Sequence, residues 1–203
     1  MKLIDLLNGV DVKTWACEPD REIRDLRYDS RKVQPGDVFV AIRGYQTDGH
    51  KYIDQAVEKG AAAVVCETPP SGAFPHVQVA DSRRALAQMS NHYFGHPAES
   101  MTMVGVTGTN GKTTTTFLIR SVLEQVTGKK VGLMGTNVNI VGDREFPAQR
   151  TTPESYEVFQ LLAQMREAGC AYAVMEVSSH SLELDRVYGI EFDAAVFTNL
   201  SRD

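Results

Sequence analysis

Cysteine is scarce in this sequence, and its three copies lie far apart. Cys17, Cys66 and Cys170 form no CxxC pair, and the five histidines do not stand at the spacing of metal ligands. The sequence therefore gives no sign of a disulfide framework or of a zinc site. Isolated thiols of this kind are typical of a reducing compartment, so we expect a cytoplasmic protein.

Long hydrophobic runs are also missing. No segment reaches the roughly 20 consecutive apolar residues that a membrane-spanning helix needs. Residues 1–7 are apolar, but Asp5 interrupts them, and Gly9 and Asp11 follow before the core of a signal peptide could develop. We therefore expect no membrane partner.

An excess of positive charge is absent as well. The 203 residues include 21 Lys and Arg against 26 Asp and Glu, which gives a formal net charge of -5. No basic cluster is interleaved with aromatic side chains, so the sequence argues against nucleic acid as a partner, and a small anionic ligand would need a local site. With 42% hydrophobic and 23% charged residues, the chain has the composition of an ordinary protein of one or two domains. We favour a monomer.

Strand and helix patterns alternate along the first hundred residues. Apolar runs at 36–42 and 61–66 are typical of buried strands, and a helix over about 50–59 lies between them and ends at Gly60. A third strand is expected at 76–80. The face that this helix is expected to bury comprises Tyr52, Ile53, Ala56 and Val57.

A further helix is predicted to begin at Ser82, whose side chain can cap the first turn. The helix-breaking residues Gly95 and Pro97 are expected to end this helix and to mark the domain boundary. We therefore expect one domain at 1–98 and a second at 99–203. The residues that repeat at helical spacing are Leu86, Met89 and Tyr93.

The alternation restarts in the second half of the chain. A glycine-rich turn leads into a helix that ends at Gly128, and the stretch after residue 134 reads as a polar excursion. Core strands of a mostly parallel sheet are expected at 101–106, 131–134, 171–177 and 194–198. The side of the helix that is expected to be buried comprises Phe117, Leu118, Val122 and Leu123.

Another helix is predicted to be capped by Thr152, with Pro153 in its first turn, and to end at Gly169. Apolar residues recur along it at the i, i+3, i+4, i+7 spacing that buries one face. The predicted fold class is therefore α/β, with helices flanking the sheets. The buried stripe comprises Val158, Leu161, Leu162 and Met165.

A glycine-rich segment, Gly108-Thr109-Asn110-Gly111-Lys112-Thr113-Thr114, joins the strand at 101–106 to its helix. A triphosphate there can meet backbone N–H groups, the positive end of the helix dipole and the ammonium group of Lys112, while the Thr113 hydroxyl can reach Mg²⁺. The strict pattern GxxxxGK[ST] has glycine where this chain has Val106, so Gly108 is expected to supply the backbone freedom. The pattern favours a P-loop-type site for ATP and Mg²⁺ over a plain strand-to-helix turn.

A carboxylate is expected beside this segment. Ligands of open α/β sheets bind beyond the carboxyl ends of the strands, and Glu176 stands at such an end. A glutamate in that place is a natural ligand of Mg²⁺, and the alternative is a strand-end side chain that faces solvent. His180, four residues further on, is either a nucleotide contact or a structural histidine.

Four segments resemble, in order and spacing, the motifs of the Mur ligases. They are Gly108 to Thr113, Thr151-Thr152-Pro153-Glu154, Met175-Glu176-Val177-Ser178-Ser179-His180 and Thr198-Asn199-Leu200-Ser201-Arg202-Asp203. Within that family they look like the ligases that add the third amino acid to UDP-MurNAc-L-Ala-D-Glu in peptidoglycan synthesis. In the first half, Asp29-Ser30-Arg31, Gly36 to Ala41, Gly44 and Asp48-Gly49-His50 resemble the UDP-binding domain that the third and fourth ligases share.

This resemblance implies an ATP-dependent, amide-forming reaction. The substrate carboxylate would attack the γ-phosphate of ATP to give an acyl phosphate, and the amine of meso-diaminopimelate or L-lysine would then displace phosphate. Lys112 and Glu176 would be catalytic, and Thr113 and Glu176 would hold Mg²⁺. The implied ATP-binding residues are Gly108, Thr109, Asn110, Gly111, Lys112, Thr113 and Thr114.

The resemblance also implies contacts with UDP-MurNAc-L-Ala-D-Glu. Ser30, Tyr45, Gln46 and Thr47 would hold the uridine end, and Thr151, Thr152, Ser178 and Arg186 would hold the muramoyl-peptide. The alternatives are a turn at Ser30, a helix cap at 151–153 and a solvated surface charge at Arg186. Two departures from the family pattern bear on the peptide contacts, namely Arg150 in place of a common asparagine and Leu184 in place of glutamine.

Three functions follow from these patterns. The first is a third-step Mur ligase whose ATP-binding domain is truncated at Asp203 and whose C-terminal domain is absent. The second is a sister enzyme, either the fourth ligase or a protein like folylpolyglutamate synthetase, which shares the phosphate loop. The third is a module that binds nucleotide or UDP-sugar without turnover. We expect the 203-residue chain itself to be inactive.

Overall fold

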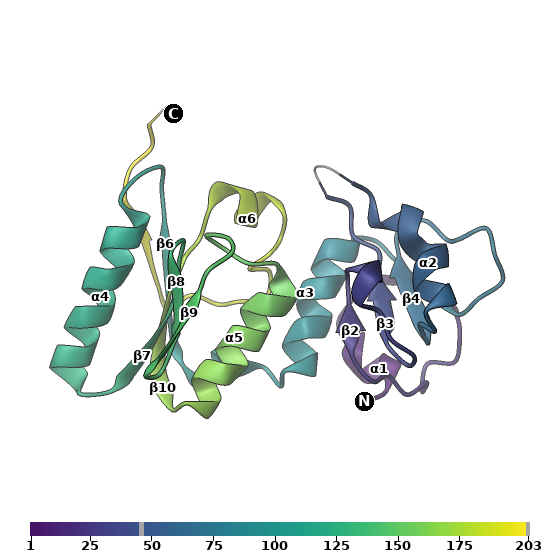
Figure 1. The fold of residues 1–203 in the computed structure, drawn as a ribbon, viewed down its shortest axis with the longest axis horizontal. Helices are drawn as coiled ribbons and strands as arrows, with labels where there is room; N and C mark the ends of the chain where they lie inside the picture. Colours follow the sequence, from purple (N-terminus) through teal and green to yellow (C-terminus); the bar gives the residue numbers. More distant parts are fainter. Residues whose placement is uncertain (45–46, 202–203) are drawn as a thin grey trace. The chain divides into compact units, whose positions relative to one another are not determined.

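The computed structural model describes residues 1–44 and 47–201. The chain divides into two compact units, Met1–Tyr93 and Phe94–Asp203, and each is a sheet with helices packed against it (Figure 1). Each unit has its own cluster of buried apolar side chains. The predicted α/β fold class is confirmed.

The first unit contains a five-stranded sheet with the order β1-β5-β4-β3-β2. Neighbouring strands are parallel except at β1, which pairs with β5 in the antiparallel sense. The strands are β1 (Val12–Ala16), β2 (Leu26–Arg27), β3 (Val38–Val40), β4 (Ala63–Cys66) and β5 (His76–Val79).

Short helices connect these strands. Ile53 and Ala56, on the helix between β3 and β4, pack with Phe39 and Val64 of the sheet, as the sequence predicted. Tyr52 does not join them, because its side chain is 42% exposed. The helices are α1 (Leu3–Leu6), η1 (Ser30–Lys32), η2 (Gly49–Tyr52), α2 (Ile53–Glu58) and α3 (Ser82–Tyr93).

The cap of α3 differs from the prediction. Asp81, and not Ser82, caps the helix, since its carboxylate accepts hydrogen bonds from the backbone N–H groups of Arg83 at 2.8 Å and Arg84 at 3.0 Å. The Ser82 hydroxyl instead donates to Glu67 at 2.9 Å. Two capping residue types stand side by side here, so local sequence alone did not decide between them.

The second unit contains a six-stranded sheet with the order β11-β6-β10-β7-β8-β9. The strands from β11 to β7 are parallel, whereas β8 and β9 are antiparallel additions. The strands are β6 (Thr102–Thr107), β7 (Lys130–Met134), β8 (Val138–Val141), β9 (Arg144–Pro147), β10 (Cys170–Glu176) and β11 (Ala194–Phe197).

The two long helices of this unit cover opposite faces of its sheet (Figure 1). On one face Ile119 and Leu123 of α4 pack against Val104 and Val174, and on the other Met165 of α5 packs close to the backbone of β7 at Gly132. The helices are η3 (Pro97–Ser100), α4 (Lys112–Thr127), α5 (Ser155–Glu167) and α6 (Ser179–Glu183).

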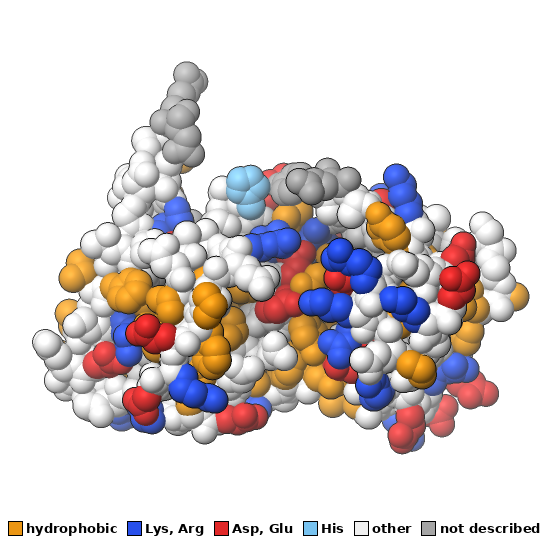
Figure 2. All heavy atoms as spheres, viewed as in Figure 1, with side chains coloured by type: hydrophobic (Ala, Val, Ile, Leu, Met, Phe, Trp, Pro, Cys, Tyr) orange, Lys and Arg blue, Asp and Glu red, His pale blue; other side chains and the backbone are white. Residues whose placement is uncertain are grey.

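The predicted buried face of α4 is largely wrong. Phe117, Leu118 and Val122 are 39%, 61% and 57% exposed, and only Leu123 of the predicted set packs on the sheet. Hydrophobic side chains accordingly reach the surface over α4 in Figure 2. The helix carries two apolar stripes, and helical spacing cannot say which of them meets the sheet.

Three further predictions for this unit need correction. The polar excursion contains the hairpin β8–β9, which turns at Gly142-Asp143 with Gly142 at φ +59°. Thr152 does not cap α5, because the helix begins at Ser155 after Glu154. The strand expected in the core at 194–198 spans Ala194–Phe197 and lies at an edge of the sheet within the described residues, where three of its four residues are exposed.

Candidate nucleotide-phosphate site

The glycine-rich loop between β6 and α4 has a backbone that only glycine adopts readily. Gly108 has φ +131°, and Gly111, directly before the helix, has φ +84°. A Cβ atom at position 108 would lie 2.2 Å from the Thr198 hydroxyl oxygen and 2.8 Å from the Asn199 carbonyl oxygen. Gly108 therefore supplies both the freedom and the close approach that this loop needs in place of a glycine at 106.

Lys112 is the first residue of the 16-residue helix α4. Its Nζ donates hydrogen bonds to the carbonyl oxygens of Gly108 at 2.7 Å and Thr109 at 3.1 Å. The ammonium group thus lies against the loop, where the positive end of the helix dipole also acts. This arrangement suits an anionic group at the start of the helix.

Glu176 ends β10, the strand that pairs with the loop-bearing strand β6. Its side chain is 1% exposed, and both carboxylate oxygens accept hydrogen bonds. Oε1 accepts from the Thr113 hydroxyl at 2.9 Å and from the Thr136 backbone N–H at 2.9 Å, and Oε2 accepts from the Thr136 hydroxyl at 3.0 Å. The strand order therefore brings the predicted carboxylate into contact with the start of α4.

Thr136 is a member of this site that the sequence analysis missed. It follows β7, which pairs with β10 on the other side from β6. Gly135 before it allows the close approach, since a Cβ there would lie 2.6 Å from Glu176 Oε1. Ligands gather beyond the carboxyl ends of parallel strands, and this rule applies to β7 as well. It could have pointed to Thr136 from the sequence.

The segment 198–201, after β11, holds the loop from the other side. The Asn199 side chain contacts one residue of the loop with both ends of its amide, because Oδ1 accepts from the Asn110 N–H at 3.1 Å and Nδ2 donates to the Asn110 carbonyl at 3.0 Å. Thr198 donates to the same carbonyl at 2.7 Å, and the Thr109 N–H donates to the Asn199 carbonyl at 2.9 Å. The loop is thus fixed by a segment about 90 residues away in sequence.

The predicted muramoyl-peptide residues are linked to Glu176 and its neighbours by hydrogen bonds. Thr152 is buried, and its hydroxyl donates to the Glu176 carbonyl at 2.8 Å and accepts from the Ser178 N–H at 3.2 Å. The Thr151 hydroxyl lies 3.1 Å from the Thr136 hydroxyl. The Ser178 hydroxyl caps α6 by accepting from the Ser181 N–H at 3.1 Å.

Arg186 joins this group through a buried ion pair. Its guanidinium contacts the Glu154 carboxylate, and the side chains are 13% and 6% exposed, respectively. It also donates to the Thr152 carbonyl at 3.1 Å. The interpretation of Arg186 as a solvated surface charge is therefore wrong, and its partner in this structure is a carboxylate of the chain itself.

The predicted uridine-binding residues lie in the first unit. The buried Ser30 hydroxyl donates to the Gln55 side chain at 2.7 Å, and the Thr47 hydroxyl lies 3.1 Å from the Tyr52 hydroxyl. Tyr45 and Gln46 lie outside the described residues.

His50 has a structural role next to the segment around Thr47. Its Nδ1 lies 2.6 Å from an Asp48 carboxylate oxygen, and its Nε2 accepts from the Glu67 N–H at 3.0 Å. Burial acts to raise the pKa of Asp48, but hydrogen bonds from the His50 backbone and ring outweigh it and lower that pKa below its usual value. The imidazole therefore ties the chain before η2 to the end of β4.

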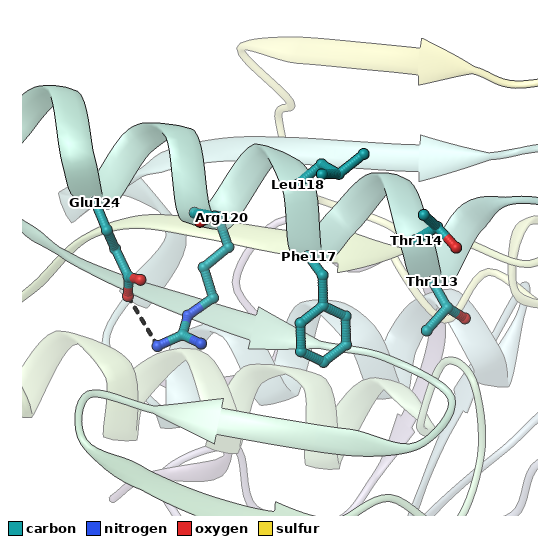
Figure 3. A pocket seen from close by; sticks show the side chains of 7 residues that line it. Thr113, Thr114, Phe117, Leu118, Arg120 and Glu124 are labelled. Atoms are coloured by element: carbon teal, nitrogen blue, oxygen red, sulfur yellow. Dashed lines mark ion pairs between the residues drawn. The ribbon is translucent and has the colours of Figure 1, made fainter.

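A groove of about 530 Å³ runs along the outer surface of α4 (Figure 3). It begins at Thr113, beside the loop, and ends at the ion pair in which Arg120 lies 2.8 Å from Glu124. Its lining residues are Thr113, Thr114, Phe117, Leu118, Arg120, Ser121 and Glu124.

Residues 1–44 and 47–201 contain neither a membrane-spanning helix nor a cluster of acidic, histidine and cysteine ligands. No helix in these ranges is long and apolar enough to cross a membrane. No group of three or more His, Cys, Asp or Glu side chains could hold a metal ion there. Mg²⁺ does not need such a cluster, because it commonly takes one or two protein oxygens together with phosphate and water. The adjacent Thr113 hydroxyl and Glu176 carboxylate fit that requirement.

These features define the class of the second unit as an α/β domain with a variant P-loop between β6 and α4. Residues 106–203 match the family "Mur ligase middle domain", and residues 22–94 match "Mur ligase family, catalytic domain". The chain belongs to the Mur ligase family.

Curated relatives match the whole chain. The UDP-N-acetylmuramoyl-L-alanyl-D-glutamate--2,6-diaminopimelate ligase of Clostridium perfringens is 47% identical over 100% of this chain and 42% of the relative. The protein of the same name from Clostridium tetani is 48% identical over 100% of this chain and 43% of the relative. The chain thus spans less than half the length of these relatives.

Solved structures give the same family. A UDP-N-acetylmuramoyl-L-alanyl-D-glutamate--2,6-diaminopimelate ligase superposes over 100% of this chain and 41% of its own, with a TM-score of 0.79 and 28% identity. A MurF ligase from Thermotoga maritima in complex with ADP covers 90% of this chain and 39% of its own, with a TM-score of 0.59 and 29% identity.

Proposed function

We propose that this chain is the UDP-sugar-binding and phosphate-binding part of a ligase that uses ATP to add the third amino acid to UDP-MurNAc-L-Ala-D-Glu. One observation carries the proposal: the glycine-rich loop places Lys112 and Thr113 at the start of α4, in contact with the buried Glu176. The relatives that match the full chain are named for this third step.

The phosphate site has a defined division of roles under this proposal. ATP supplies the phosphoryl group that activates the substrate carboxylate. Residues 108–114 bind its phosphates through loop N–H groups, Lys112 neutralises their charge, and Thr113 and Glu176 hold Mg²⁺. The present contacts of Lys112 with the loop carbonyls support this role, because they keep the ammonium group where the phosphates would lie.

The substrate is shared between the two units in this proposal. Residues 1–98 form the UDP-binding domain, in which Ser30 and Thr47, together with Tyr45 and Gln46, bind the uridine end. Residues 99–203 form the first part of the ATP-binding domain, in which Thr151, Thr152, Ser178 and Arg186 bind the muramoyl-peptide. The buried contacts of Thr152 and Arg186 support this role, because they hold the two residues in fixed positions.

The proposal also covers the setting of the protein. We place it in the cytoplasm as a monomer, and the free thiols of Cys17, Cys66 and Cys170 support a reducing compartment.

The fourth-step ligase is the weaker alternative, because the MurF structures superpose with TM-scores of 0.60 and 0.59 against 0.79 for the third-step enzyme. The chain spans 42% of a curated relative, so ligand binding is the property that these 203 residues can be tested for.

Two calorimetric titrations test the proposal. UDP-MurNAc-L-Ala-D-Glu should bind the chain, and Ser30→Ala should weaken that binding because a buried hydroxyl is lost. Mg-ADP should bind independently, and Lys112→Ala should weaken it about tenfold or more, since a charge-assisted hydrogen bond contributes roughly 1.5–3 kcal/mol. Full Mg-ADP affinity in Lys112→Ala would overturn the phosphate site.

A further inference from the structure

We propose that Thr136 is a positioning residue that orients the Glu176 carboxylate for a divalent cation and connects it to Thr151. This inference rests on the proposed function, since the cation belongs to the phosphate site. Thr136 contacts both oxygens of the carboxylate, one through its backbone N–H at 2.9 Å and the other through its hydroxyl at 3.0 Å. Among the residues that the structure describes, no other donates two hydrogen bonds to this carboxylate.

Thr136 differs from Thr113 in that it holds the carboxylate without being an expected ligand of the cation. The Thr113 hydroxyl donates its proton to Glu176 Oε1, and as a metal ligand it would also offer a lone pair to the cation. The two donors on Thr136 are not required as ligands. Thr136 therefore fixes the plane of the carboxylate through two donors that serve no other expected purpose in the site.

The position of Thr136 is itself fixed by the sheet. It follows β7, which pairs along its length with β10, and Glu176 ends β10. Gly135 brings the chain so close to the carboxylate that a side chain there would collide with it at 2.6 Å. The backbone at Thr136 therefore has little freedom to move away from the Glu176 carboxylate.

The polarity of the hydrogen bonds extends this arrangement to Thr151. A carboxylate only accepts, so the single hydroxyl proton of Thr136 goes to Glu176. The Thr151 hydroxyl, 3.1 Å from that of Thr136, must then be the donor of their shared bond. A directed chain of hydrogen bonds runs from Thr151 through Thr136 to Glu176. It joins the expected peptide-binding segment to the expected cation ligand.

This series of hydrogen bonds predicts that the peptide-binding segment and the cation site are coupled. A substrate group that takes the Thr151 proton removes a donor from Thr136 and changes how strongly Thr136 holds Glu176. By linkage, a cation on Glu176 must change substrate affinity by the same factor as the substrate changes cation affinity. Thr136 is the residue through which that factor acts.

The test is Mn²⁺ binding to the 203-residue chain in the presence of ADP, followed by electron paramagnetic resonance of the free ion. Thr136→Val keeps the shape and the backbone N–H but removes the hydroxyl, and we expect Mn²⁺ affinity to fall about 10- to 100-fold, as for other residues that orient metal ligands. Thr136→Ser should restore most of it. Thr102→Val, an exposed threonine at the start of β6, is the matched control and should bind as wild type.

Each outcome has a separate meaning. Wild-type affinity in Thr136→Val, or a Thr136→Ser variant as weak as Thr136→Val, would overturn the inference and leave the phosphate site standing. Absence of Mn²⁺ binding by the wild-type chain with ADP would overturn the proposed cation site and the inference with it. Thr151→Val should have a smaller effect that vanishes in the Thr136→Val background, whereas additive effects would refute the directed chain.

Discussion

The phosphate loop and the threonine segment at 151–152 both contact Glu176, through Thr113 and Thr152, but different contacts hold them in place. The loop owes its shape to Gly108 and Gly111, whose positive φ values few other residues adopt. The threonine segment has ordinary residues, and it is held by Glu176, Ser178 and Arg186, between 24 and 34 residues away in sequence. The glycines explain the shape of the loop from the local sequence alone, whereas the motif at 151–152 does not reveal the distant contacts that hold it.

The largest effect is expected from breaking the ion pair beside the threonine segment. Arg186→Ala should lower the free energy of unfolding of the second unit by about 3–5 kcal/mol, because it removes the cation that pairs with the buried Glu154 carboxylate. Urea unfolding measures the change. Lys130→Gln, which removes the exposed ion pair with Asp143 in the same unit, is the control and should change stability little. Equal effects of the two substitutions would show that the Arg186 pair is solvated.

The next effect concerns the loop. Gly108→Ala should lower the free energy of unfolding by about 1–3 kcal/mol through backbone strain and should abolish Mg-ADP binding, since the new Cβ meets the Thr198 hydroxyl. Gly128→Ala is a matched control, because Gly128 also has a positive φ but an added Cβ there would meet no atom within 4 Å. It should cost about 1 kcal/mol and leave nucleotide binding intact. Loss of binding in both variants would mean that general instability, not the loop, is responsible.

A similar but more local effect is expected at Thr152. Thr152→Val should lower the free energy of unfolding by about 1–3 kcal/mol, because the Ser178 N–H loses its buried acceptor. Thr152→Ser keeps the hydroxyl and should retain most of the stability in the same urea titration. If valine is tolerated as well as serine, the threonine segment is held by packing and not by this hydroxyl.

The smallest effect lies in the first unit, which contains neither region and serves as a baseline. Burial raises the pKa of the Cys66 thiol from 9.0 to about 11. A raised pKa favours the neutral thiol in the folded state, so its stabilising contribution is complete below pH 9.0 and decreases as the pH rises towards 11. Cys66→Ala should flatten this alkaline decrease in thermal melts. Cys66 should also react with iodoacetamide more slowly than the partly exposed Cys17 under mildly alkaline conditions.

The sequence was a good guide wherever a local pattern has a single structural solution. The strand runs at 61–66 and 171–177 became β4 and β10, and Gly60, Gly128 and Gly169 follow the helix ends with positive φ. Where a local pattern is compatible with two structures, the prediction from the sequence was wrong. The two apolar stripes of α4 are one case, and the choice between Asp81 and Ser82 as the cap of α3 is another. In both, a distant partner made the decision.

The sequence by itself determined the fold class, the variant phosphate loop and the carboxylate at the end of β10, because glycine conformation, helix dipoles and strand periodicity are local properties of the chain. Only the tertiary structure decided that Thr136 holds Glu176, that Asn199 fixes the loop and that Arg186 pairs with Glu154. Those contacts depend on the order of strands in the sheet. That order follows from the packing of the whole unit, so no window of neighbouring residues contains it.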